Sequence, residues 1–560
     1  MSGYTSVDGV PLLTAPYSGK LRAGLVFRVG SADETLAVHG ITELVTRLAL
    51  HHLDQPDFDY GVGVGADITQ FQVQGPPEAV AGFLGGVCRA LGDLPLHRLE
   101  AERELLYGES LHRSRGVNGD MALWRHGARD YGLGSYAPWG VRRVGADEVR
   151  RWAAEWFTSA NASVWVAGDV PAGLSLPLAP GVRKPLPPQS SALPKTPAWF
   201  HGPSGGVVLD GVVSRSTAAR LFTDVFERAL YRELRQEGGI SYAVSTDYSP
   251  YGAGSAMVTA FADALRENEG ALAGAFVEVL RQLSKGRIDP ADLDAARTKT
   301  LRALEHPDVE AGTLPSAAAS VLTGYAFGSV AQVRAELAEV TVPDLAAVAG
   351  QVLETALLQV PFTGARVEVG FDAAPVASTA RVTGRSVKSA SGDGSVLAIG
   401  ADGVSVLRGD SAATVYFKEC AARLDFPDGA RHFVGADGII VRVEPTIFPV
   451  TPQDQADLAA AVAPELAVPM PARPADQIPR PGSGQPLPQR DRGRRRKIEL
   501  AVTVAVMIVL TWLFIDSANA WTPADGEFTE KVILAEMIAA LVAFLRAAVI
   551  LWPRMQTGRW

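Results

Sequence analysis

The sequence predicts an α+β protein with two similar α/β sandwich domains, then a small, mostly β module and a C-terminal pair of membrane helices. Three observations lead to this prediction. Segments 1–184 and 200–372 run through the same order of strand-like and helical stretches. Segment 381–463 changes to short strands and Asp-Gly turns, as in "GADGVSVLRG". Two long apolar runs close the chain, and they are the membrane candidates.

Composition places the chain among globular proteins with several domains. Its 560 residues are too many for one ordinary core. The net charge of −9 leaves no basic surplus, so we expect no nucleic-acid partner. Cys88 and Cys420 are the only cysteines, too few for a disulfide framework, and they favour a reducing compartment. The N-terminal residues lack a basic start followed by an apolar core, so we expect no signal peptide.

Strand-like runs and amphipathic helices alternate in both domains, which a proline-rich linker, 185–199, joins. In the first domain the predicted order is strands at Val10–Ala15 and Leu25–Val29, a helix over His39–Leu53, a strand at Asp67–Gly75, and helices at Glu78–Leu91, Arg98–Arg113 and Asp147–Phe157. In the second it is a strand at Gly206–Val213, a helix at Thr217–Glu237, two strands over Ile240–Asp263, helices at Asn268–Lys285 and Asp289–Leu304, and a closing helix and strand.

The β module ends in the helix-like "PQDQADLAAAVA" and is similar to bacterial pleckstrin-homology-like modules, although it carries no diagnostic motif. Without a basic cluster, it is expected to bind protein or act as a spacer rather than bind lipid headgroups. Segment 464–497 is proline-rich and then basic, which is typical of an extended linker.

Residues 498–515 are almost wholly apolar and long enough to cross a bilayer, so they form the first predicted membrane helix. The second, 532–552, carries Glu536 and Arg546, and an amphipathic helix lying on the membrane is the alternative. "RDRGRRRK" precedes the first helix, Arg residues follow the second, and the loop between them is mostly acidic. The positive-inside rule then places the large N-terminal part and the C-terminal tip in the cytoplasm.

The stretch "LVFRVGSADETLAVHGITELVTRL" resembles the opening of the pitrilysin/insulinase family, the inverted-motif zinc peptidases. Gly30, Ser31, Asp33 and Glu34 match the family's segment between strand and helix, and the resemblance extends over residues 5–372. It implies the two-domain branch of the family. Active members carry H-x-x-E-H on the following helix, in which two His ligate zinc and the Glu is the general base, and a later Glu is the third ligand.

Aligned on Gly40, the two histidine positions hold Glu43 and Arg47, and the general-base position holds Thr46. Glu109 falls at the third ligand. Arginine is a fixed cation that does not bind metal, and threonine is no base at neutral pH. The sequence therefore predicts no metal site, no zinc cofactor and no catalytic activity of the chain on its own.

Glu43 and Arg47 are four residues apart, the spacing of a helical ion pair. Our hypothesis is that Arg47 replaces the charge of zinc and is held by Glu43 and Glu109. Two alternatives remain: a solvated surface pair, and a metal site shifted to the neighbouring histidines, such as His39.

In the second domain, "ELRQEGGISYAVSTDYSPYG" resembles the family segment whose arginine and tyrosine bind substrate. Arg235 and Tyr242 match that pair, and the resemblance implies roles in charge recognition and oxyanion binding. The alternative is that both residues only support the fold.

Three functions are therefore considered. The first is a membrane-anchored, inactive family member that binds a peptide or protein, or acts as a scaffold. The second is the non-zinc subunit of a heteromeric peptidase, which would contribute Arg235 and Tyr242 to a partner's active site. The third is a hydrolase that uses displaced residues, testable by peptide cleavage with and without chelator. The partner is a zinc-bearing homologue or a second copy, and co-purification with such a homologue would separate the first two.

Overall fold

In the computed structural model the first compact unit of the chain is Met1–Gly484. The structure describes residues 5–51, 57–111, 116–202, 206–263, 268–325, 327–361 and 369–482, all within the first unit. The predicted membrane helices, 498–515 and 532–552, lie outside these residues. Within them, no single helix has the length and apolar composition to cross a membrane, and only the pair Pro77–Gly92 and Leu96–Ser110, bent by 79°, meets that test together.

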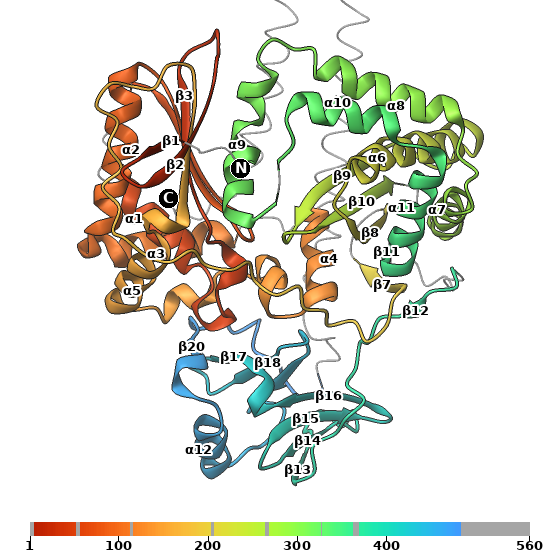
Figure 1. Ribbon diagram of the computed structural model, residues 1–560. Coiled ribbons are helices and arrows are strands. Elements are labelled where there is room, and N and C mark those ends of the chain that lie inside the picture. Colours follow the sequence, from red (N-terminus) through yellow and green to blue (C-terminus); the bar gives the residue numbers. More distant parts are fainter. Residues whose placement is uncertain are drawn as a thin grey trace, which may run out of the picture. The chain divides into compact units, whose positions relative to one another are not determined.

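The first half of the chain forms a six-stranded mixed sheet in the order β1-β2-β6-β3-β5-β4 (Figure 1). Its strands are β1 (Thr5–Val7), β2 (Val10–Ala15), β3 (Arg22–Phe27), β4 (Asp59–Val64), β5 (Thr69–Gln74) and β6 (Ala162–Ala167). Its helices are α1 (Ile41–Leu50), α2 (Pro77–Gly92), α3 (Leu99–Ser110) and α5 (Ala146–Trp156). Leu25 and Phe27 on one face of β3 join Val164 and Val166 of β6 in the core beneath these helices.

The second half repeats this topology except at the outermost strand, because β1 pairs antiparallel with β2 whereas β12 pairs parallel with β7. Its sheet has the order β12-β7-β11-β8-β10-β9. β11 corresponds to β6 of the first sheet, because each pairs parallel with one neighbour and antiparallel with the other. The strands are β7 (Ala198–Gly202), β8 (Gly206–Ser214), β9 (Val244–Tyr251), β10 (Ser255–Asp263), β11 (Leu357–Pro361) and β12 (Asp372–Ala373). The helices are α6 (Thr217–Leu230), which continues as a π-helix over Tyr231–Glu237, α7 (Glu269–Ser284), α8 (Pro290–Ala303), α10 (Val330–Glu339) and α11 (Val342–Thr355). The repeated pattern in the sequence thus corresponds to a repeated strand order.

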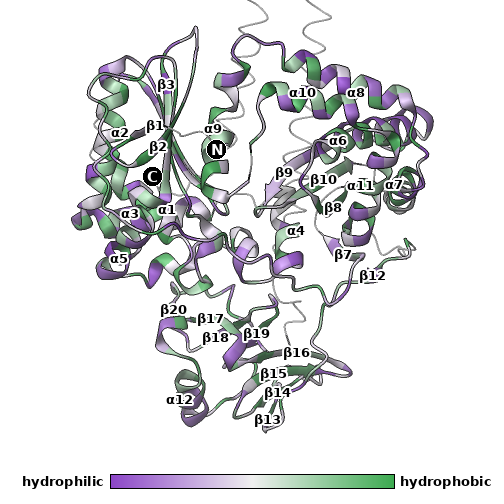
Figure 2. Ribbon diagram, in the orientation of Figure 1, coloured by the Kyte–Doolittle hydropathy of each residue, from purple (hydrophilic) through white to green (hydrophobic). Residues whose placement is uncertain are grey.

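The two halves exchange one helix each. Helix α9 (Val309–Thr323), from the second half, packs on the face of the first sheet that carries Val26 and Trp165. Helix α4 (Gly116–His126), from the first half, packs on the second sheet, where Trp124 stacks on Phe200 with ring centroids 4.8 Å apart. In Figure 2 the helices carry both green and purple residues, as expected for helices with one buried face.

The β module forms two four-stranded sheets and a helix. The first sheet is a meander of β13 (Arg385–Lys388), β14 (Val396–Ile399), β15 (Gly403–Arg408) and β16 (Ser411–Tyr416), and the second holds β17 (Cys420–Asp425), β18 (Arg431–Gly435), β19 (Ile440–Val443) and β20 (Ala467–Pro469). Helix α12 (Pro452–Ala460) contributes Leu458 to the core between them. The predicted linker from 464 is wrong at its start, because β20 pairs in parallel with β17. The similarity to pleckstrin-homology-like modules stays a prediction.

The β module packs against the segment that precedes α1. Leu36 and Ala37 of that segment share a hydrophobic cluster with Ala422 and Leu424 of β17. Close by, the Ala128 amide donates a hydrogen bond of 3.0 Å to the Ala436 carbonyl. The module therefore packs against the segment that leads into α1, the helix that carries Glu43, Thr46 and Arg47.

A buried carboxylate ties the chain beyond β20 to the module. Arg473 donates to both carboxylate oxygens of Glu444 at 2.9 and 2.8 Å, and His432 lies 2.7 Å from the same carboxylate. Burial acts to raise the pKa of Glu444, but the hydrogen bonds and charges of His432 and Arg473 outweigh it and lower the pKa to about 2.

Because the pKa of Glu444 is lower in the folded state, its contribution to stability is complete above about pH 4.5 and is lost as the pH falls towards about 2. Glu444→Gln should lower the free energy of unfolding at pH 7 by up to about 3 kcal/mol, and this difference should shrink in acid. Urea titrations of both proteins between pH 7 and pH 3 measure it. Glu465→Gln, which changes an exposed glutamate, is the control. A difference that does not change with pH would contradict the prediction.

Candidate functional site

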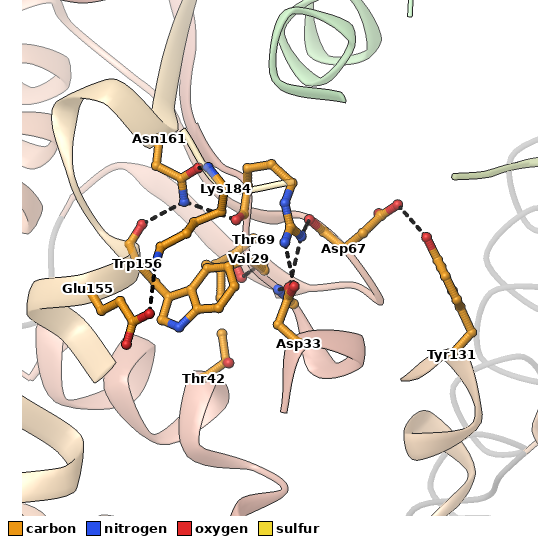
Figure 3. Close-up of polar contacts among 12 residues, drawn as sticks. Val29, Asp33, Thr42, Asp67, Thr69, Tyr131, Glu155, Trp156, Asn161 and Lys184 are labelled. Carbon is orange, nitrogen blue, oxygen red and sulfur yellow. Dashed lines mark hydrogen bonds and ion pairs between the residues drawn. The ribbon is translucent and has the colours of Figure 1, made fainter. Parts of the chain in front are cut away.

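The Gly-Ser-x-Asp-Glu segment begins with a buried charge pair. Arg28, at the end of β3, pairs with Asp33 and donates to the Asp67 carbonyl at 2.8 Å. Asp33 also accepts the Gly30 amide at 2.8 Å. Figure 3 shows Asp33 and Asp67 in this network, with the Tyr131 hydroxyl donating to the Asp67 carboxylate at 3.3 Å. Asp33 is therefore a structural residue that fixes the turn after the strand.

Glu34 caps the helix that follows. Its buried carboxylate accepts the backbone amides of Gly40 at 2.8 Å and Thr42 at 2.9 Å, and it lies 2.7 Å from Nδ1 of His39. A carboxylate at this position satisfies amides that the first turn of a helix leaves unpaired. Gly40 has a φ of 98°, a conformation that L side chains rarely adopt. His39 thus belongs to the helix cap, and this geometry gives no support to the shifted metal site.

Helix α1 and helix α3 bring Glu43, Arg47 and Glu109 together. Arg47 donates to the two oxygens of Glu109 at 3.1 and 2.5 Å and to Oε1 of Glu43 at 3.3 Å. The side chains of Arg47 and Glu43 are 22% and 24% exposed, whereas that of Glu109 is 51% exposed. The ion-pair group of Glu43, Arg47 and Glu109 is therefore shielded from water at α1 and open to water at α3. It is neither a fully solvated surface pair nor a fully buried one.

The arrangement does not fit a zinc ion. The Arg47 guanidinium contacts both carboxylates that would otherwise be available as ligands, and it has no lone pair to offer a metal. Burial acts to lower the pKa of Arg47, but Glu109 and Glu43 outweigh it and raise the pKa, so the side chain remains charged. Thr46 is buried, and its hydroxyl donates to the Glu43 carbonyl at 2.8 Å. In the described part of the chain, no group of three or more His, Cys, Asp and Glu side chains is placed to hold a metal.

The second half links its corresponding helices in the same way. Asp292 of α8 is buried and accepts hydrogen bonds from Arg228 at 2.9 Å and Arg232 at 2.8 Å, on α6 and its π-helical continuation. Burial acts to raise the pKa of Asp292, but the two arginines outweigh it and lower the pKa. In both halves an arginine on one helix therefore contacts a carboxylate on the helix two positions later in the chain. The pairs of helices are α1 with α3, and α6 with α8.

Arg235 and Tyr242 lie on the surface of the second half. Arg235 is in the π-helix, with its guanidinium carbon 5.0 Å from the centre of the Tyr231 ring. Tyr242 is 66% exposed, and its backbone amide donates to Asp263 at 2.9 Å. Both side chains are accessible to another molecule, as a role in a partner's active site would require, and that role stays a prediction.

Strand β4 is a surface that the sequence did not reveal. It is the last strand of the first sheet, pairs with β5 alone among the described strands, and is exposed along most of its length. Added Cβ atoms at Gly61 or Gly63 would meet no atom within 4 Å, while Tyr60 and Val62 are 44% and 37% exposed. Apolar residues alternate with Asp and Gly in "DYGVGV", but a short run with two glycines is a weak strand signal, because glycine is depleted in strands.

Part of the sequence matches a protein-family model, and both halves resemble solved structures. Residues 213–300 match the family model described as the peptidase M16 inactive domain. Solved structures match over most of the two halves: a complex III2 structure from Candida albicans with Inz-5 bound is 13% identical and covers 65% of this chain and 97% of that chain, with a TM-score of 0.54. The match at residues 213–300 and the shared fold both support the resemblance to the pitrilysin/insulinase family.

Two further structures support the same fold. A protease from Helicobacter pylori is 16% identical and covers 64% of this chain and 99% of that chain, with a TM-score of 0.53. A peptidase M16 inactive domain from Pseudomonas fluorescens is 14% identical and covers 67% of this chain and 99% of that chain, also with a TM-score of 0.53. No curated protein matches the sequence.

The family's metal site can be rebuilt on this helix if only the side chains differ. The triple variant Glu43→His, Thr46→Glu and Arg47→His restores the ligand set of active members around the existing Glu109. We expect it to retain about one zinc per chain after gel filtration, measured by elemental analysis, and the unaltered chain to retain none.

The same triple variant with Glu109→Gln lacks the third ligand and is the control, with zinc affinity lower by about tenfold or more. A triple variant that folds but retains no zinc would contradict the alignment of Glu43, Arg47 and Glu109 with the family's ligands. Zinc at about one per chain in the unaltered protein would contradict the replacement of the metal by Arg47.

Proposed function

We propose that this chain is a non-catalytic pitrilysin/insulinase-family protein that acts as a binding or scaffold subunit at a membrane. The observation that carries this proposal is the contact of Arg47 with Glu43 and Glu109, at the positions where active members hold zinc. With Thr46 in place of the general base, the helix offers neither a metal-bound water nor a group to deprotonate it.

Strand β4 is the binding surface that this proposal favours. An edge strand presents unpaired backbone N–H and C=O groups, and an extended peptide can add to it as a further strand. The two glycines leave one face of β4 bare, while Tyr60 and Val62 supply apolar contacts on the other. Charged side chains commonly protect edge strands from such pairing, and in β4 only Asp59, at its start, carries a charge.

The β module supports a scaffold role because it is joined to the first half at the segment before α1. A protein that binds the module would act on the same body that carries α1 and β4. One of the similar structures is a complex III assembly, in which a chain of this fold is one component among several. We extend that arrangement to this chain as part of the proposal.

Val62→Lys should weaken peptide binding at β4. A lysine on an edge strand opposes the addition of another strand, and Val62 is exposed enough to be replaced without loss of core packing. We expect the Kd for a fluorescein-labelled peptide of alternating Val and Thr residues to rise about tenfold or more, measured by fluorescence anisotropy.

Ser245→Lys places the same charge on β9, the edge strand of the second sheet, and should leave the Kd unchanged. Equal weakening by both variants, or no binding by the unaltered chain, would reject β4 as the peptide surface. Cleavage of the peptide by the purified chain would reject the non-catalytic proposal.

We also propose that segments 498–515 and 532–552 anchor the chain, with its large N-terminal part in the cytoplasm. The full chain should sediment with membranes and resist extraction by alkaline carbonate, whereas a chain ending at Gly484, the end of the first compact unit, should be in the supernatant. Protease added to sealed vesicles of known orientation tests the side of the membrane. Sedimentation of the shortened chain would show that another part of the protein attaches it.

A further inference from the structure

Two arginines near the start of α6 have no acidic partner among the residues that the structure describes. The guanidinium carbon of Arg215 lies 3.4 Å from the centre of the Tyr325 ring, and that of Arg220 lies 5.3 Å from the centre of the Tyr248 ring. Most other arginines described above contact carboxylates, as Arg47 and Arg228 do. Arg215 and Arg220 contact aromatic faces instead.

A tyrosine ring leaves most of the bonding capacity of an arginine unused. A guanidinium carries five N–H donors in its own plane, and a ring stacked on its face accepts none of the in-plane donors. Arg215 is half-buried, so water reaches its donors less readily than on an open surface. Burial lowers the pKa of Arg215; Tyr325, Tyr248 and Asp67 act to raise it, whereas the charge of Arg220 acts to lower it. Arg215 and Arg220 are therefore close enough for their like charges to interact, and neither forms an ion pair with a carboxylate among the described residues.

The charged groups that face this pair are few. Asp67, on the turn between β4 and β5, is the acid that acts on Arg215, but its carboxylate accepts the Tyr131 hydroxyl and its pKa is raised by burial. Glu336 of α10 accepts the hydroxyl of Thr217, in the first turn of α6. Neither carboxylate forms an ion pair with Arg215 or Arg220 in the described chain.

We propose that Arg215 and Arg220 form a binding site for an oxyanion, either a carboxylate or a phosphate group. Guanidinium groups bind both chemistries through paired hydrogen bonds, and an anion would neutralise the repulsion between them. Tyr248 and Tyr325 hold the two guanidinium groups in place from their flat faces and leave the in-plane donors available. This site goes beyond the proposed function and does not depend on peptide binding at β4.

Calorimetric titration of the full chain with inorganic phosphate, pyrophosphate and a penta-glutamate peptide tests the proposal, at constant ionic strength set with chloride. Saturable binding of at least one probe is expected, and the tightest probe identifies the source of the oxyanion. Arg215→Gln and Arg220→Gln should each weaken it about tenfold or more. Asp67→Asn, which removes a repelling carboxylate, should tighten it.

Arg150→Gln is the matched control, because it removes one positive charge from an exposed pair with Asp147. It should leave the affinity unchanged. Absence of saturable binding by every probe would overturn the proposal, and so would equal weakening by Arg150→Gln and the two site variants. Arg220 is exposed, so its variant tests the site even if the Arg215 variant is unstable.

Discussion

Burial of the second face of each sheet is the constraint on which the rest of the structure depends. In each half the local helices cover one face, and period-two alternation leaves apolar residues on the other, such as Val26 and Trp165 in the first sheet. Each half covers that face of the other with a helix, α9 on the first sheet and α4 on the second. Arg125 of α4 adds a buried pair with Asp210 of β8. Neither sheet can bury both faces without the other half, so the duplicated halves form one body.

The position of the candidate site depends on this packing, because the site lies on helix α1, which is held at both ends. Glu34 holds the first turn of α1, and Arg47 joins its last turn to α3. A zinc ion would also join these two helices, so the Arg47 contacts keep a link between α1 and α3 without a metal. An exposed ion pair contributes only about 0.2–1 kcal/mol, and a half-shielded one somewhat more. The link is therefore weaker than a metal but independent of metal supply.

Local patterns in the sequence predicted much of the fold and part of the candidate site. The strand at Val10–Ala15 was correct to the residue, and the spacing of Glu43 and Arg47 was sufficient to predict their contact, because residues four apart share a helix face. The approach of Glu109 required the family resemblance, since it depends on how α3 packs against α1. Strand β4 was missed because its two glycines have low strand propensity and its alternating run is short.

Helices α9 and α4 were missed for a different reason. α9 contains Pro315, which predicts a break, and the face it buries meets the other half of the chain rather than a neighbour in sequence. The strand β20 was assigned to a linker because its proline-rich segment gives no strand signal until β17 is there to pair with it. These errors share a cause: each element is stabilised by contacts far away in the sequence, which composition and periodicity do not encode.

The same long-range contacts connect the β module to the site. β17 packs on Leu36 and Ala37, only a few residues before the Glu34-bound cap of α1. A movement of the module would therefore displace the start of α1, and through α1 the Arg47 contact with α3. In a peptidase such a displacement would disturb catalysis. In this chain, where Arg47 contacts Glu43 and Glu109, it would instead alter that contact and the packing of α1, which would let a binding subunit of the proposed kind respond to a partner.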